Sequence, residues 1–333
     1  MTTLAPSRAV VPLRRRHPLV AYALRRVAIT VALLWFVSIL IFAATQALPG
    51  NAAGQILGRS ASAAEKARFS AQLGLNRSVL AQYGSWIGGV LHGDLGRSLA
   101  SQQPVTAFIS SRVGNSALLA LAAVLVMLPV SITLGTIAGV RRGRLADHAI
   151  SGISLGLIAL PEFVSGTILA VVFGVTLAWF PPTSIIPSGS SPLSDLTLLI
   201  LPVLTLCIAG SAYIIRMLRA GVADAMASDY VQAARLNGIP ERRIIMSHAL
   251  RNALGPTVQV VALTIQWLVG GIVVVETVFS YPGLGQGLVQ SVTARDIPVV
   301  QSLTLLIAAF YILVNLVADM IVIVLVPKLR TAL

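Results

Sequence analysis

Three carboxylic acids stand inside otherwise apolar stretches of the sequence: Glu162, Glu276 and Asp319. An ionised carboxylate at the centre of a lipid bilayer costs roughly 3 kcal/mol or more, so we expect these side chains to face protein or water. Glu276 precedes a Ser-Tyr-Pro-Gly turn that it could support with hydrogen bonds. Asp319 is expected to pair with arginines at the cytoplasmic surface. Glu162, next to Pro161, is expected to mark a kink that lines a pathway.

Few other residues are arranged for chemistry. The only cysteine, Cys207, lies in an apolar stretch, and the four histidines are scattered without ligand spacing. The two lysines, Lys66 and Lys328, do not follow the glycine pattern of a phosphate-binding loop. No serine–histidine, paired-aspartate or His/Glu metal arrangement occurs within the apolar stretches. We therefore expect no catalytic residue, no metal site and no ATP-binding motif in this chain.

The composition is that of a membrane protein. Of the 333 residues, 56% are hydrophobic and 11% are charged, whereas soluble domains carry about 25% charged residues. The excess apolar surface must face something other than water, and lipid is the simplest candidate. The net charge of +13 also raises the possibility of nucleic-acid binding, but the arginines flank apolar spans instead of forming a basic face with aromatic residues, which argues against that class.

Six apolar stretches are long enough to cross a bilayer, which takes roughly 20 residues. Helices are expected, because backbone groups in lipid must pair within their own segment. The sequence thus predicts an all-α polytopic membrane protein. The six stretches are residues 27–48, 113–140, 149–180, 196–215, 257–279 and 299–326.

The arginines predict the orientation of these spans. They gather in segments 1–26, 141–144 and 216–251, with two further basic residues in the tail 327–333. Basic residues concentrate on the cytoplasmic side, so both termini are expected there. The first span is expected to be retained, because its apolar core is longer than that of a signal peptide.

The largest external segment, residues 49–112, is expected to form short helices. Ser62 and Glu65 have the spacing of a capping box, and a second helix is predicted at 78–91. A Gly-Asp-Leu-Gly turn follows at 93–96. The segment is interpreted either as a structural cap over the helix ends or as a landing surface for an external partner.

The segment 221–255 predicts a cytoplasmic helix–glycine–helix hairpin. Asp229 is expected to cap the first helix, and Gly238 to end it in a left-handed conformation. Pro240 suits the first position of a second helix, expected at 241–254, and Pro256 the start of the next span.

The hairpin carries more apolar residues than an idle loop needs, which favours docking into a groove over packing only on its own membrane domain. These residues are Val231, Ala234, Leu236, Ile239, Ile244 and Ile245.

At this hairpin the sequence resembles a known family. YVQAARLNG at 230–238, continued by IPERRIIMSHALRNALGP at 239–256, resembles the EAA loop of ABC-importer permeases, with Gln232 where a glutamate often stands. The likeness covers most of the chain. Motifs that narrow it to the dipeptide, oligopeptide and nickel importer group are LGLN at 73–76, HGDLGRS at 92–98, LPEF at 160–163, ETVFSYPGLG at 276–285 and NLVAD at 315–319.

The resemblance implies a type I importer permease of the bacterial inner membrane, with the transmembrane domain at 113–326. It would form half of a pore with a second, related permease. Two ATPase subunits would carry ATP and Mg²⁺, so no cofactor is expected on this chain, and an extracytoplasmic binding protein would deliver the substrate. The residues implied in ATPase coupling are Tyr230, Ala233, Ala234, Arg235, Gly238, Pro240 and Arg243. The candidate contacts for the binding protein are Asp94, Gly283, Leu284 and Gly285.

Several alternatives stay open at this point. Glu276 could also belong to an external gate or contact the amino terminus of a peptide. Peptides are the default substrate, and nickel complexes, haem and glycosides remain alternatives. An ion-coupled secondary transporter would need no ATPase, but no inverted repeat is evident. A channel is also possible, but a single short charged ring is all that the sequence could offer it. An intramembrane enzyme fits less well, because no catalytic arrangement occurs within the spans.

Overall fold

The computed structural model describes residues 18–47, 77–187 and 190–325, with isolated positions between 62 and 71. These residues form helices joined by loops, and the described part of the chain has no strand pairing beyond one isolated bridge between Arg97 and Pro104. The predicted all-α class is confirmed. Expectations for residues 1–17, 48–61 and 326–333 lie outside the described residues.

Within the described part of the chain, five helices are long and apolar enough to cross a membrane. Each of them runs beyond the apolar stretch expected from the sequence at one end only, and at the other end it stops within two residues of the expected boundary. The five helices are α1 (Pro18–Gln46), α5 (Val105–Val140), α8 (Thr197–Met226), α11 (Leu250–Val278) and α13 (Ile297–Leu325).

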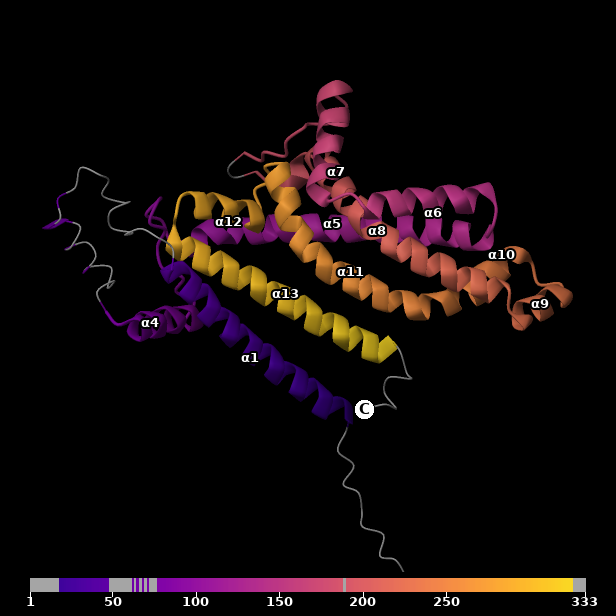
Figure 1. The fold of residues 1–333 in the computed structure, drawn as a ribbon, viewed down its shortest axis with the longest axis horizontal. Coiled ribbons are helices and arrows are strands. Elements are labelled where there is room, and N and C mark those ends of the chain that lie inside the picture. The colour runs from indigo at the N-terminus through magenta and orange to yellow at the C-terminus, as the bar shows by residue number, and fades with distance from the viewer. Residues whose placement is uncertain are drawn as a thin grey trace, which may run out of the picture.

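The sixth span is broken. Helix α6 (Leu145–Ile158) is followed by α7 (Glu162–Leu169), which continues as the π-helical turn η1 (Ala170–Thr176), and the two halves meet at 109°. The kink expected at Pro161 is therefore a sharp turn. Proline donates no N–H and restricts the residue before it, so the helix ends there. In Figure 1, α7 stands away from the other long helices.

Helix α8 is the centre of the membrane domain. It packs against α5 on one side and α11 on the other, while α1 and α13 lie side by side along one flank (Figure 1). The close approach of α5 and α8 depends on small residues, because a Cβ at Gly139 would come within 2.7 Å of Val222 Cβ. Large side chains that fill the core are Leu119, Met127, Leu201, Leu206, Leu268 and Phe279.

Short helices mark the two ends of the molecule. Helices α9 (Asp229–Leu236) and α10 (Glu241–Arg243) lie at one end, the hairpin end, and α4 (Val79–Leu91) and α12 (Leu284–Thr293) lie at the opposite end (Figure 1). The predicted helix at 78–91 is confirmed as α4.

Ser78 caps α4, since its Oγ accepts a hydrogen bond from the backbone N–H of Ala81 at 3.4 Å. The predicted capping box is also confirmed. Ser62 N–H donates to Glu65 Oε2 at 2.8 Å, and Glu65 N–H donates to Ser62 Oγ at 3.3 Å.

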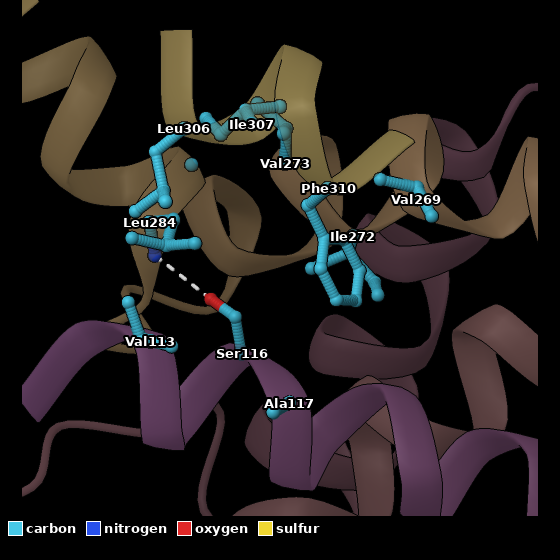
Figure 2. Close-up of a pocket in the computed structure, with 11 residues that line it drawn as sticks. Val113, Ser116, Ala117, Val269, Ile272, Val273, Leu284, Leu306, Ile307 and Phe310 are labelled. Carbon is cyan, nitrogen blue, oxygen red and sulfur yellow. Dashed lines mark hydrogen bonds between the residues drawn. The ribbon is translucent and has the colours of Figure 1, made fainter. Parts of the chain in front are cut away.

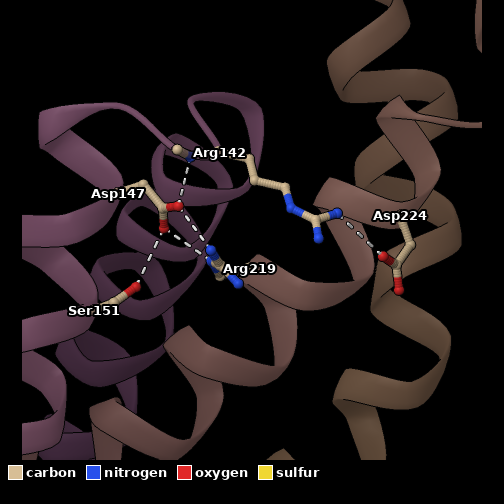
Figure 3. Close-up of polar contacts among 6 residues, drawn as sticks. Arg142, Asp147, Ser151, Arg219 and Asp224 are labelled. Carbon is tan, nitrogen blue, oxygen red and sulfur yellow. Dashed lines mark hydrogen bonds and ion pairs between the residues drawn. The ribbon is translucent and has the colours of Figure 1, made fainter.

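A partly buried ion pair joins α6 to α8 at the hairpin end (Figure 3). The guanidinium of Arg219 donates two hydrogen bonds to the carboxylate of Asp147, at 2.8 and 2.7 Å. The side chain of Asp147 is 2% exposed and also accepts hydrogen bonds from Gly143 N–H and Ser151 Oγ. A looser pair, Arg142–Asp224 at 3.8 Å, lies beside it on the surface.

The two ion pairs should differ in their effect on stability. Asp147→Asn replaces the buried carboxylate and leaves Arg219, whose side chain is 32% exposed, without its partner, so it is expected to lower the free energy of unfolding by about 2 kcal/mol. Asp224→Asn, at a side chain that is 80% exposed, should change it by less than about 1 kcal/mol. Detergent-denaturation curves of the two purified variants test this, and equal losses would contradict it.

Candidate functional site

The first arm of the hairpin begins one residue earlier than expected. Ser228 has extended backbone angles (φ −78°, ψ 153°) and stands at the N-cap, while Asp229 is the first helical residue. The prediction that Asp229 caps the helix is wrong. Its carboxylate still lies in the first turn, where a negative charge interacts favourably with the helix dipole.

Gly238 ends α9 as predicted, with φ at +73°. Its N–H donates to the carbonyl of Arg235 at 3.0 Å, and the N–H of Ile239 donates to the carbonyl of Ala234 at 3.1 Å. These two hydrogen bonds form a Schellman motif, which requires the left-handed conformation that glycine adopts without strain.

The second arm is continuous with a membrane span, which corrects the expectation of a separate helix at 241–254. Pro240 precedes α10, which passes through the π-helical turn η3 (Ile244–Ala249) directly into α11. Pro256 lies inside α11 instead of opening a new helix. A π-helical turn often accompanies a functional site, and here it connects the hairpin to the span without a flexible loop.

Most of the apolar residues of the hairpin pack inside it. Val231 and Ile244 are completely buried and Ala234 is 7% exposed, with Ile239 packed against them. The expectation that all of these residues form a docking surface is therefore wrong, since the two arms need them to hold each other. Leu236, at 90% exposure, is the most exposed large apolar side chain of the hairpin, ahead of Met246 at 57% and Tyr230 at 42%.

Polar contacts fix the hairpin further. Arg235 donates two hydrogen bonds to Glu241 across the glycine turn, at 3.2 and 2.7 Å. Asn252 Nδ2 of α11 donates to the hydroxyl of Tyr230 at 2.9 Å. Of the other candidate coupling residues, Ala233, Pro240 and Arg243 are exposed. The hairpin is thus a preformed projection with Leu236 near its tip.

At the opposite end, Glu276 is completely buried. Its Oε1 accepts a hydrogen bond from Ser116 Oγ of α5 at 2.5 Å, and its Oε2 accepts from the backbone N–H groups of Gly285 and Gln286, at 2.6 and 3.3 Å. Ser116 Oγ in turn accepts from the N–H of Leu284 at 2.8 Å, as Figure 2 shows. The carboxylate therefore joins α5, α11 and the start of α12.

The turn before α12 is buried, not displayed. Gly283, Leu284 and Gly285 all lie inside the subunit, and a Cβ at Gly283 would overlap the carboxylate of Glu276. The expectation that these three residues contact a binding protein is wrong for this subunit, because Glu276 and the neighbouring helices cover them. Asp94, by contrast, is exposed and accepts a hydrogen bond from Gly96 N–H at 2.9 Å.

Residues of α5 that the sequence did not single out hold this turn. Arg112 Nη1 donates to the carbonyl of Gly283 at 3.2 Å, and Asn115 Nδ2 donates to that of Pro282 at 2.8 Å. Tyr281 OH donates to the carbonyl of Asn115 at 2.9 Å. Arg112 and Ser116 are four residues apart on one helix face, and that spacing was the available signal.

A second buried acid fixes the loop after α4. Asp296, 3% exposed, accepts hydrogen bonds from Ser98 Oγ at 2.5 Å and from the N–H of Leu99 at 3.0 Å. The loop that carries Asp94 is thereby attached to the connection between α12 and α13.

The two remaining intramembrane acids have different surroundings. Asp319 forms an ion pair with Arg26 at 3.1 Å, which joins α13 to α1. Glu162 lies at the bend between α6 and α7, half-buried against α11, where a Cβ at Gly271 would stand 3.0 Å from its Oε1.

Comparison with known proteins agrees with this architecture. Residues 131–331 match the family described as "Binding-protein-dependent transport system inner membrane component", and residues 19–134 match the N-terminal region of such membrane components. The chain belongs to this family. It is a multi-pass permease component of the inner membrane, and the predicted family and location are confirmed.

Two relatives match the permease over nearly its whole length. The glutathione transport system permease protein GsiC of Escherichia coli is 36% identical over 309 residues, which cover 93% of this chain and 98% of the relative. The oligopeptide transport system permease protein AppB of Bacillus subtilis is 33% identical over 313 residues, which cover 93% and 99% of the two chains.

Gly283 tests how tightly the permease packs around Glu276. Gly283→Ala is expected to lower the free energy of unfolding by about 3 kcal/mol, because the added methyl group displaces a buried carboxylate. Gly270→Ala, a change in α11 with no atom within 4 Å of the added group, should be neutral or stabilising by up to about 1 kcal/mol. Thermal unfolding in detergent compares them, and a neutral Gly283→Ala would contradict the assignment.

Proposed function

We propose that this permease forms half of the pore of an ATP-driven peptide importer. A second, related permease completes the pore, two ATPase subunits bind ATP and Mg²⁺, and an extracytoplasmic binding protein supplies the substrate. The main structural support for this proposal is the preformed hairpin, which projects from the membrane domain and exposes Leu236. The peptide class is supported by the names of the relatives GsiC and AppB, which transport glutathione and oligopeptides.

In this proposal the hairpin docks on an ATPase subunit in the cytoplasm. Leu236 enters the partner, flanked by Tyr230, Ala233 and Arg243, while Ala234 and Gly238 keep the shape of the turn. Because α8 leads into the first arm and the second arm runs into α11, closure of the ATPase subunits moves these two spans together. Such a rigid-body movement changes the side from which the pathway is open.

The opposite end then faces the outside and receives the binding protein. The loop with Asp94 is exposed there and attached to the membrane domain through Asp296. Glu276 acts as a scaffold under this surface, since its carboxylate already has three donors from the protein. Asp319 acts likewise between α1 and α13.

Leu236→Asp should uncouple the transporter without unfolding the permease. The side chain is 90% exposed, so the free subunit loses little, but a docked leucine is worth about 2 kcal/mol, and a buried aspartate costs more. We expect association with the ATPase subunits to weaken at least about 30-fold and substrate-stimulated ATP hydrolysis to fall with it. Copurification and ATPase assays of the reconstituted complex measure both.

The matched control is Leu80→Asp, at a leucine of α4 that is 83% exposed at the opposite end. It should leave the ATPase association unchanged. Gly238→Val, which strains the turn, should reduce coupling as well. Wild-type ATP hydrolysis and uptake in both Leu236→Asp and Gly238→Val would refute the docking role.

The proposed orientation in the membrane can be tested by labelling cysteines that are introduced at the two ends of the molecule. Cys207 is the only cysteine and is 6% exposed, so added surface cysteines can be read against a low background. A membrane-impermeant maleimide should label Asp94→Cys in intact spheroplasts and Asn237→Cys only after permeabilisation. The reverse pattern would place the hairpin outside and overturn the proposal.

A further inference from the structure

A partly open hollow lies at the bend between α6 and α7, near the middle of α8 and α11. Its volume is about 170 Å³, and its lining includes Glu162, Tyr213 and Trp267. Two further cavities, of about 80 and 290 Å³, are lined by apolar residues with a few serines or a cysteine; the smaller is shown in Figure 2. The hollow at the bend is therefore chemically different from them.

The polar groups of this hollow have no partner within the described residues. The carboxylate of Glu162, the hydroxyl of Tyr213 and the indole N–H of Trp267 make neither a hydrogen bond nor an ion pair with any other described residue. Glu162 is half-buried, and the two aromatic side chains are 52% and 44% exposed. Such groups within a membrane are expensive unless they meet water or a ligand. Their convergence from three helices points to a ligand.

The chemistry of the lining selects the kind of ligand. A carboxylate gives a strong, charge-assisted hydrogen bond to a cationic donor, and the faces of tyrosine and tryptophan rings attract cations. A divalent metal ion is a poor match, because calcium and magnesium require several oxygen ligands and the hollow offers a single carboxylate. A primary ammonium group satisfies both the charge and the rings.

We propose that Glu162, Tyr213 and Trp267 bind the amino-terminal ammonium group of the transported peptide half-way along its path. This assignment rests on the proposed function, which supplies the peptide. Tyr213 lies on α8 and Trp267 on α11, the two helices that the coupling hairpin joins. Movement of the hairpin therefore carries both rings together relative to Glu162 on α7, so the site holds the ammonium group in one access state and releases it in the other.

Equilibrium binding to the assembled transporter tests the site without the binding protein. The complex of both permeases and both ATPase subunits is placed in nanodiscs with tritiated trialanine as the probe. Unlabelled trialanine should compete at least about tenfold better than N-acetyl-trialanine, because the lost charged hydrogen bond is worth at least that factor. Glu162→Gln should reduce this ratio to near one, and Trp267→Leu should lower it about threefold.

Trp179→Leu is the control, since this tryptophan is 64% exposed and does not line the hollow; it should keep the wild-type ratio. Absence of trialanine binding to the wild type, or an unchanged ratio in Glu162→Gln, would overturn the inference. If Glu162→Gln releases the second permease and Glu162→Asp restores it, the carboxylate pairs with a cation of that subunit, which also overturns the inference.

ATP-dependent uptake of alanyl peptides by the wild type with its binding protein separates the two proposals. Uptake with an unchanged binding ratio in Glu162→Gln refutes only the ammonium site. Lack of uptake refutes the proposed importer function itself.

Discussion

The end of the molecule that holds α12 depends on one buried carboxylate. The first N–H groups of a helix have no acceptor within the helix, and Gly283 before α12 has no side chain with which to cap them. Glu276 supplies the acceptor from α11 instead, with Ser116 of α5 as a third partner. This arrangement allows the chain to turn sharply inside apolar surroundings, where unpaired backbone groups would be costly.

The need to bury the Glu276 carboxylate next to the turn also explains the glycines and the arginine around it. Gly283 and Gly285 leave the space that the carboxylate and Val273 occupy. Arg112 contacts the turn from α5 and lies with its guanidinium 4.3 Å above the ring of Phe108, which shields its charge from lipid. One charged network thus holds three helices together, and each of its members has a partner.

At the hairpin end, charge is used to connect spans to one another. The Asp147–Arg219 pair attaches α6 to α8, and the hairpin attaches α8 to α11. A force on the hairpin is therefore distributed over the central helices instead of being absorbed in a loop. These helices also carry the rings of the proposed ammonium site, so the proposed coupling surface and the proposed pathway share the same rigid elements.

The sequence by itself determined the features that depend on near neighbours. The number of apolar runs that are long enough to cross a bilayer predicts the number of spans. Gly238 predicts the end of α9, and the Ser62–Glu65 spacing predicts a capping box. Each of these signals acts over about four residues or within one continuous run. The sequence also predicts that Asp319 is paired, because an acid within a membrane span needs a charged or polar partner.

Only the tertiary structure decided which residues are inside. Val231 and Ala234 belong to an apolar surface in the sequence, yet they face Ile244 because the two arms fold onto each other. Gly283 looks like an exposed turn residue until Glu276 and α5 cover it. The Asp147–Arg219 pair joins positions 72 residues apart, and no local pattern encodes such a contact, because it exists only when α6 packs on α8.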